Sequence, residues 1–220
     1  MAIRFDNAHS EPGIHGWLHV AERPNGSAIV LTHGAGSDCN ARLLVEMAEA
    51  FAGAAFTVLR FDLPFRRARP HGPPFPAAAA RDRDGLRRAV ALMREQKHRQ
   101  VFMGGHSYGG RQASMLASEE PEVADGLLLL SYPLHPPKKR EELRTKHFPK
   151  LNTPAFFVHG TRDPFATSSE MEAALKLIPG AHAVLEVEGA GHDLLSKKGG
   201  DELPARVVGE FLKFVKTIEG

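Results

Sequence analysis

The chain has 220 residues, 42% of them hydrophobic and 25% charged, and a formal net charge of +2, so we expect one globular domain over residues 1–220. The near balance of charge gives no reason to expect nucleic acid or a membrane as a partner, and the single cysteine, Cys39, excludes an internal disulfide and Cys-rich metal sites. No signal-peptide pattern and no membrane-spanning apolar run are present, which predicts a cytoplasmic protein.

Short apolar runs alternate with longer amphipathic segments along the chain. Residues 14–20 (IHGWLHV) alternate between apolar and polar side chains, which predicts a half-exposed strand at a sheet edge. Nearly continuous apolar runs predict buried strands over 27–34, 56–62, 100–106, 126–132, 154–160 and 183–188. Helical spacing predicts helices over 40–52, 78–97, 108–119, 167–178 and 204–217. This order predicts an α/β fold with a mostly parallel sheet and helices on both faces.

The stretch GGHSYGG, residues 104–110, lies between a predicted strand and a predicted helix. Within it, GHSYG matches the pattern G-x-S-x-G, in which a sharp strand-to-helix turn presents a serine. Glycines on both sides of such a turn prevent clashes with the neighbouring strand and helix. We therefore predict that Ser107 is a nucleophile; the alternative is a flexible glycine loop that contains a serine by chance.

Two later residues have the order and placement that a serine nucleophile needs. Asp163 follows the predicted strand 154–160, and His192 follows the predicted strand 183–188. The loops after parallel strands meet at one edge of a sheet, so both residues can converge on Ser107. His192 would take and return the serine proton, and Asp163 would orient the imidazole and stabilise its charged form. Taken singly, the aspartate could be a turn residue and the histidine a solvated one.

An acyl-transfer site also needs donors for the developing oxyanion. One predicted donor is the backbone N–H of Tyr108, which directly follows the serine. The second should come from HGAG, residues 33–36, which resembles the HGGG-type oxyanion loop and offers the N–H of Ala35 or Gly36. The alternative for HGAG is an ordinary glycine turn between a strand and a helix.

Together these motifs resemble the α/β-hydrolase superfamily over nearly the whole chain. More narrowly, residues 60–70, 104–112 and 158–165 resemble a small branch related to the dienelactone hydrolases, here with serine in place of their cysteine nucleophile. The resemblance implies an eight-stranded sheet whose second strand is antiparallel and a triad of Ser107, Asp163 and His192. One branch member is a subunit of an acetyltransferase complex, so the same fold also serves as a scaffold.

The surroundings of the predicted site carry weaker signals. Residues 133–154 leave little room for a cap domain, although KKREELRTKHF (138–148) could form one short helix, so we expect an open or thinly covered pocket. We predict substrate contacts from Phe65, Arg67 and Arg111, with a basic rim that would favour anionic acyl groups. The alternative is a solvated basic loop with one arginine tying it down.

The resulting prediction is a serine hydrolase that cleaves a carboxylic ester or thioester of a small molecule through an acyl-enzyme. It needs no cofactor, and none of the twelve histidines falls in a metal-ligand motif, so no metal is expected. The alternative is a non-catalytic interaction protein that retains the fold. The sequence leaves the acyl group, the leaving group and the oligomeric state open.

Overall fold

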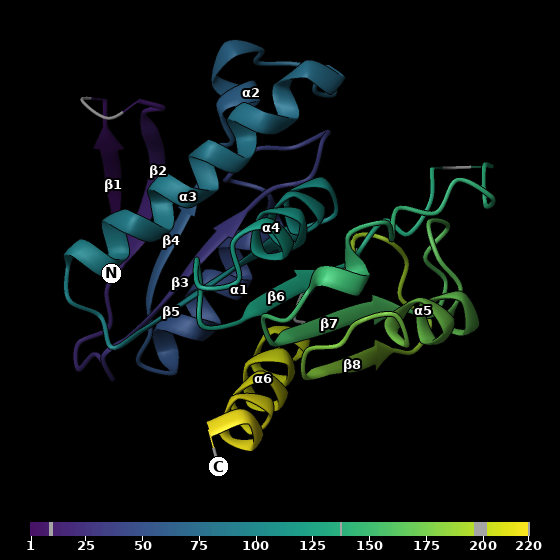
Figure 1. Cartoon of the computed structure of the whole chain (residues 1–220). Coiled ribbons are helices and arrows are strands. Elements are labelled where there is room, and N and C mark those ends of the chain that lie inside the picture. The colour runs from purple at the N-terminus through teal and green to yellow at the C-terminus, as the bar shows by residue number, and fades with distance from the viewer. Residues whose placement is uncertain (9–10, 137, 196–201, 220) are drawn as a thin grey trace.

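The computed structural model describes residues 1–8, 11–136, 138–195 and 202–219. These residues form one eight-stranded sheet in the order β1-β2-β4-β3-β5-β6-β7-β8 (Figure 1). The second strand runs antiparallel to both of its neighbours, and all other neighbouring strands are parallel, as the resemblance implied. The strands are β1 (Ala2–Asn7), β2 (Ile14–His19), β3 (Ser27–Thr32), β4 (Thr57–Phe61), β5 (Gln100–His106), β6 (Leu127–Leu130), β7 (Ala155–Gly160) and β8 (His182–Val187).

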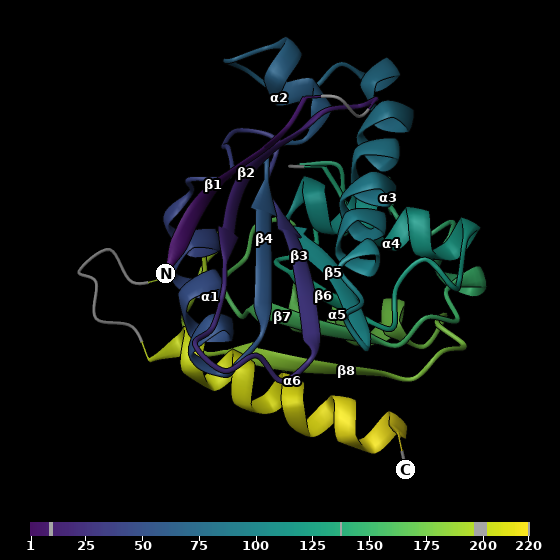
Figure 2. The same cartoon turned by 90° about the vertical axis from the view of Figure 1, so that its left-hand side faces the viewer.

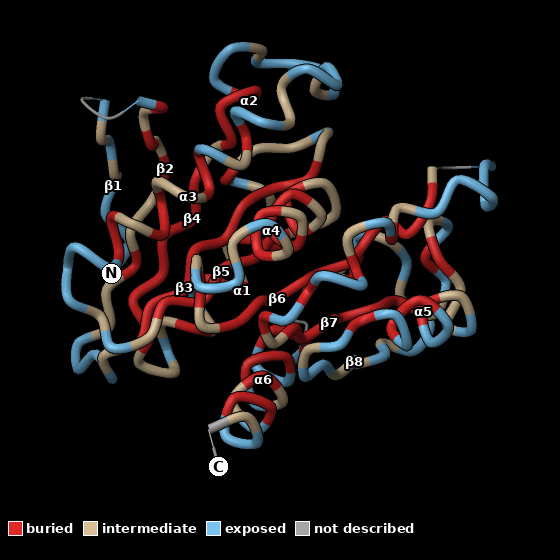
Figure 3. Tube along the Cα trace, in the orientation of Figure 1, coloured by how far each residue is buried: buried red, intermediate tan, exposed pale blue. Residues whose placement is uncertain are grey.

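The central strands are those that the apolar runs predicted. Every residue of β3, β4, β6 and β7 is buried, because helices cover both faces of this part of the sheet. The two edge strands differ, since β8 alternates exposed and half-buried residues and β1 is mostly exposed (Figure 3). The first strand carries too few buried apolar side chains to give a sequence signal, and it was not predicted.

The helices are α1 (Arg42–Gly53), α2 (Pro64–Ala68), α3 (Ala79–Glu95), α4 (Tyr108–Glu119), α5 (Ser168–Leu175) and α6 (Leu203–Glu219). Five of them confirm the predicted helices. The start of α5 is fixed by a capping box, in which Thr167 and Glu170 satisfy each other's backbone N–H groups. The short helix α2 was not predicted; Pro64 occupies its first turn, where the missing N–H has no cost.

The core has two parts, one on each face of the sheet. Along β3, Val30 packs toward α3, α4 and α5, whereas Ile29 and Leu31 pack toward α1 and α6. Figure 2 shows α1 and α6 on one side of the sheet and α3 and α4 on the other. This arrangement keeps the strands rigid and leaves the loops at their carboxyl ends free to build a site.

The connection between β6 and β7 holds no α-helix among its described residues, so the short helix expected over KKREELRTKHF is wrong. Apart from Phe148, the only large apolar residue of this segment is Leu143, which is 47% exposed, so a helix here would have no apolar face to bury. One 3-10 turn (Phe148–Lys150) is formed instead, and the described residues of this connection build no cap domain over the sheet edge. In the described part of the chain, no helix combines the length and apolarity needed to cross a bilayer.

Candidate active site

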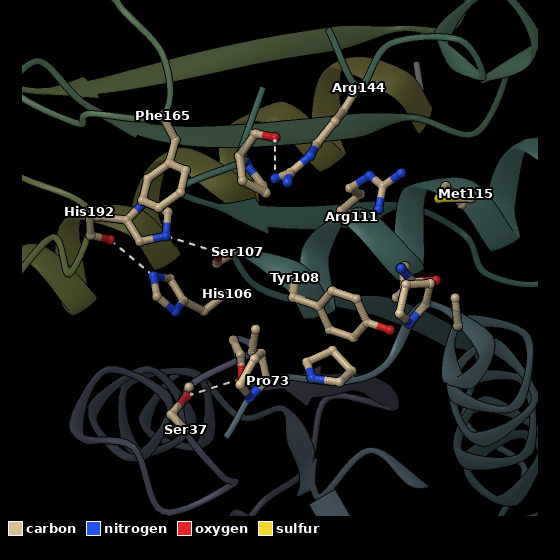
Figure 4. Close-up of a pocket in the computed structure, with 18 of the residues that line it drawn as sticks. Ser37, Pro73, His106, Ser107, Tyr108, Arg111, Met115, Arg144, Phe165 and His192 are labelled. Carbon is tan, nitrogen blue, oxygen red and sulfur yellow. Dashed lines mark hydrogen bonds between the residues drawn. The ribbon is translucent and has the colours of Figure 1, made fainter. Parts of the chain in front are cut away.

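Three predicted residues meet at the carboxyl edge of the parallel strands. Ser107 stands between β5 and α4, Asp163 follows β7, and His192 follows β8. His192 Nε2 lies 2.9 Å from Ser107 Oγ (Figure 4). On the other side of the ring, His192 Nδ1 lies 2.8 Å from Asp163 Oδ2. The Asp163 side chain is 0% exposed, so water does not compete for its bond to the histidine. The structure therefore joins serine, imidazole and carboxylate into one hydrogen-bonded chain.

The backbone at Ser107 has the strained conformation that the glycine-rich motif predicted. Its φ is 51° and its ψ is −113°, a combination that non-glycine residues rarely adopt. A Cβ atom on Gly105 would lie 2.4 Å from the carbonyl oxygen of Thr32, and one on Gly109 would lie 2.7 Å from that of His33. The two glycines thus let the elbow press against the end of β3, which holds the serine in its strained turn.

His192 is held both at its ring and at its backbone. The ring of Phe165 lies 4.3 Å from it, centroid to centroid, and Asp163 Oδ1 accepts a hydrogen bond from the backbone N–H of Phe165. On the other side, His106 Nε2 donates to the carbonyl oxygen of His192 at 2.9 Å. Burial, reinforced by the nearby His192, lowers the pKa of His106 to about 4, so this ring is neutral at neutral pH.

The predicted oxyanion loop, residues 33–36, lies beside the serine, and Ser37 directly follows it. The position that a Cβ atom on Gly34 would take is 3.5 Å from Ser107 Cβ. His33 fixes the start of this loop: its Nε2 accepts from the N–H of Leu63, so its Nδ1 carries the proton and donates to the carbonyl oxygen of Gly34. Burial lowers the pKa of His33, which keeps the ring in this neutral form.

Arg66 fixes the rest of the loop. Its Nη2 donates to the carbonyl oxygen of Ala35 at 2.9 Å and its Nε to that of Ser37 at 2.8 Å, while Nη1 donates to two carbonyls of residues 69–70. In a trans peptide the N–H points away from the preceding C=O. The N–H groups of Ala35 and Gly36 therefore point away from His33 and Arg66, neither of which lines the cavity.

The serine opens into a cavity of about 810 Å³ that residues 34–37, Tyr108, Arg111 and His192 help to line. Within the described residues, no acceptor bonds the backbone N–H of Tyr108, Ala35 or Gly36. The Tyr108 hydroxyl donates to Asp82 Oδ2 at 2.7 Å, and the other oxygen of this buried carboxylate accepts from the N–H of Phe65. Burial raises the pKa of both Asp82 and Tyr108.

Of the three predicted substrate contacts, only Arg111 lines this cavity. Phe65 is 4% exposed and packs edge-on against the Tyr108 ring at 5.6 Å, behind the cavity wall. Arg67 is exposed and lines a separate depression with Pro12 and His15. The reason is α2, which turns Phe65 inward and Arg67 outward. Arg66, its neighbour, is the arginine that ties the basic loop down.

Sequence reasoning missed two residues of the site, Phe165 and Arg144. Phe165 belongs to the TRDPF motif, but nothing in the motif showed that its ring would cover His192. Arg144 lines the cavity from the β6–β7 connection, where no periodicity marks it. His159 lies outside this cavity and is buried, and neither of its ring nitrogens has a hydrogen-bond partner among the described residues. In the same described ranges, no group of three or more metal-ligating side chains occurs.

Comparisons with known proteins identify a matching family model and several solved structures with a similar fold. A family model described as Alpha/beta hydrolase domain matches residues 25–217. Among solved structures, TT1662 from Thermus thermophilus is 22% identical over 98% of both chains, with a TM-score of 0.72. The dienelactone hydrolase from Anabaena variabilis is 19% identical over 97% of both chains, with a TM-score of 0.76. Est1E from Butyrivibrio proteoclasticus, solved with ferulic acid bound, is 15% identical over 93% of this chain and 96% of its own, with a TM-score of 0.72.

Proposed function

The chain belongs to the Alpha/beta hydrolase domain family, and on this basis we propose that it is a serine hydrolase that cleaves a carboxylic ester or thioester of a small substrate. The observation that carries the proposal is the hydrogen-bonded chain Ser107–His192–Asp163 at the mouth of the cavity. A serine hydroxyl is a weak nucleophile until a base within hydrogen-bond reach takes its proton. In this proposal one domain, residues 1–220, carries the whole site.

Acylation begins when Ser107 Oγ attacks the carbonyl carbon while its proton passes to His192 Nε2. The former carbonyl oxygen, now negatively charged, accepts hydrogen bonds from the backbone N–H of Tyr108 and from that of Ala35 or Gly36, the predicted oxyanion donors. Collapse of the tetrahedral intermediate breaks the bond to the leaving group. His192 returns the proton to the departing oxygen or sulfur, and the acyl group remains on Ser107.

Deacylation repeats these steps with water as the nucleophile. His192 takes a proton from the water as it attacks the acyl-enzyme, the same N–H groups hold the oxyanion, and Ser107 leaves with the proton from His192. Asp163 keeps the Nδ1–H of His192 directed at its own carboxylate through both halves of the cycle, so Nε2 always faces the serine. The free acid and the alcohol or thiol are the products.

Three features support the proposal beyond the triad geometry. The oxyanion loop is held by His33 and Arg66 before any substrate arrives, which is the preorganisation that catalysis needs. The cavity volume suits a small molecule. Est1E, which has a similar fold, binds a small aromatic acid. A scaffold protein, the alternative, has no need of any of these features.

A fluorophosphonate probe followed by intact-mass measurement tests the proposal. We expect one label on the wild-type protein and none on Ser107→Ala. The matched control is Ser37→Ala, a serine that lines the same cavity but has no histidine bonded to it, and this variant should keep the label. Folded wild-type protein that takes no label would contradict the proposal, and a label that survives Ser107→Ala would move the nucleophile to another residue.

A further inference from the structure

Two arginines line the cavity on the side away from the oxyanion loop. Arg111 belongs to the first turn of α4, four residues after Ser107, and Arg144 comes from the β6–β7 connection. Figure 4 shows both of them across Ser107 and Tyr108 from Ser37, which marks the oxyanion loop. Two segments far apart in the sequence therefore bring two guanidinium groups to one end of the cavity.

Neither guanidinium has a carboxylate partner. Among the described residues, no ion pair includes Arg111 or Arg144, whereas five arginines outside the cavity each pair with a carboxylate: Arg81, Arg83, Arg87, Arg88 and Arg94. Arg111 Nε is buried without a hydrogen-bond partner in the part of the chain that the structure describes. Arg144 makes a single side-chain hydrogen bond, a long one of 3.4 Å from Nη1 to the carbonyl oxygen of Pro133. Arg111 also interacts with the buried hydroxyl of Tyr132, but the pair keeps further N–H donors that have no acceptor among the described residues.

The two charges also lie close enough to oppose each other. Burial and the positive charge of Arg111 both lower the pKa of Arg144. Burial, with a further contribution from Arg111, lowers the pKa of His147 to about 4, so this neighbouring ring adds no charge of its own at neutral pH. Among the residues that the structure describes, the only carboxylate that lines the cavity is that of Asp193, an exposed residue next to His192. An anion bound between the arginines would relieve this repulsion.

Resting on the proposed hydrolase function, we propose that Arg111 and Arg144 bind a carboxylate carried by the acyl group of the substrate. Guanidinium groups match a carboxylate through paired hydrogen bonds, which makes arginine the usual partner of this anion. The leaving group must lie near His192, which protonates it, and Figure 4 shows Arg111 on the other side of Ser107. The carboxylate therefore belongs to the part of the substrate that stays on the serine.

The spacing limits the length of that acyl group. Ser107 is the N-cap of α4 and Arg111 is the fourth residue of this helix, so their backbones are one turn apart, with a rise of about 6 Å along the helix axis. A carboxylate held at this end of the cavity can be joined to the scissile carbonyl by only a few methylene groups. The substrate class is thus a monoester or monothioester of a short dicarboxylic acid, with one end cleaved and the other end held by the arginines.

A pair of matched esters tests this assignment. Mono-para-nitrophenyl glutarate carries the carboxylate, and para-nitrophenyl valerate is its neutral counterpart of similar length. We expect wild-type protein to favour the glutarate ester in kcat/KM, and we expect Arg111→Gln and Arg144→Gln each to reduce that preference by about 10-fold or more. The control is Arg67→Gln, which removes the same charge from an exposed arginine outside the cavity and should leave the preference unchanged.

The ratio of kcat/KM for the glutarate ester to kcat/KM for the valerate ester is measured within each variant. Partial unfolding lowers both values by the same factor and leaves this ratio unchanged, so a change in the ratio reports recognition and not folding. Arg144→Lys supplies a second check, since it keeps the charge and should retain part of the preference. A preference that is absent in the wild type, or unchanged in both glutamine variants while hydrolysis continues, would overturn the assignment.

A binding measurement keeps this inference separate from the proposed function. Calorimetry with Ser107→Ala protein should show binding of glutarate and none of its dimethyl ester, and the added change Arg144→Gln should abolish the glutarate signal. If no ester is hydrolysed by the wild type, the proposed function fails, yet glutarate binding still supports the arginine pair. If esters are hydrolysed but glutarate binds no better than its dimethyl ester, the pair is not a carboxylate site.

Discussion

The two sides of the cavity treat their arginines in opposite ways. On the oxyanion side, Arg66 is 8% exposed and gives its Nε and both terminal nitrogens to backbone carbonyls. On the other side, Arg111 and Arg144 line the cavity, and among the described residues the two side chains donate to one backbone carbonyl, that of Pro133, through a long bond from Arg144. One arginine is fully occupied by the protein, and the other two are left with donors that the protein does not use.

This difference indicates that the oxyanion side stabilises the transition state of the proposed reaction and that the side with Arg111 and Arg144 recognises the substrate. Groups that stabilise a transition state work best when they are fixed in advance, and the loop under Arg66 is fixed. Groups that recognise a substrate must instead keep free donors, at some cost in stability, until the substrate supplies the acceptor. The predictions below test whether chemistry and recognition can be disturbed separately.

The largest effect is expected at the buried acid. Asp163→Asn keeps the size of the side chain but favours the wrong tautomer of His192, so kcat should fall about 10⁴-fold. Hydrolysis of para-nitrophenyl valerate measures this loss. Asp193→Asn, which alters an exposed carboxylate in the next position after His192, should cost far less. Similar losses from both variants would contradict the assignment of the acid.

A smaller loss is expected when the oxyanion loop is released. Arg66→Met removes every hydrogen bond from this side chain to residues 35, 37, 69 and 70, so the loop donors lose their fixed positions. We expect kcat to fall about 10- to 100-fold for the glutarate and valerate esters alike, with KM changed less. Arg66→Lys should recover little, because one ammonium cannot replace a planar fork.

This variant sharpens the comparison of the two sides. If Arg66→Met changes the preference between the two esters as strongly as Arg144→Gln does, the division into a chemical side and a recognition side is wrong.

A third prediction concerns stability at the residue between the two sides. Tyr108→Phe leaves Asp82 Oδ2 buried without the hydroxyl that it accepts from, so the free energy of unfolding should fall by about 1–3 kcal/mol. Urea unfolding measures this change. In an Asp82→Ala background the same tyrosine change should cost much less, and equal costs in both backgrounds would exclude the hydrogen bond as the cause.

A fourth prediction concerns the response of stability to acid. The pKa values of His19, His106 and His147 lie near about 4, below the ordinary value of 6.5. The unfolded chain therefore binds more protons than the folded one between these values, and stability should fall as the pH drops from about 6.5 to about 4. Tm measured across this range checks the sign. His147→Gln should show a shallower decline, and parallel curves would rule out its contribution.

Much of this architecture could be predicted from the sequence, for physical reasons that differ between regions. Buried parallel strands need continuous apolar runs, which made β3 to β7 visible, and a strained elbow needs glycines, which marked Ser107. By contrast, β1 lies exposed at an edge and leaves no pattern.

The direction of side chains in short irregular segments was the other feature that could not be predicted from the sequence. The basic loop predicted arginines near the site, but only the turn of α2 decides that Arg66 points inward and Arg67 outward. Arg144 lies in a connection without periodicity, so its meeting with Arg111 depends on how the chain returns from β6, which no local pattern records.

The positive φ of Ser107 places stability and activity in conflict at one residue. The strain arises because a residue with a Cβ atom adopts a positive φ here. Glycine at this position would adopt the same backbone conformation without that conformational cost. An inactive Ser107→Gly protein would then be the more stable one. Random mutation selected for heat resistance alone would tend to remove the nucleophile, and only selection for turnover keeps a side chain there.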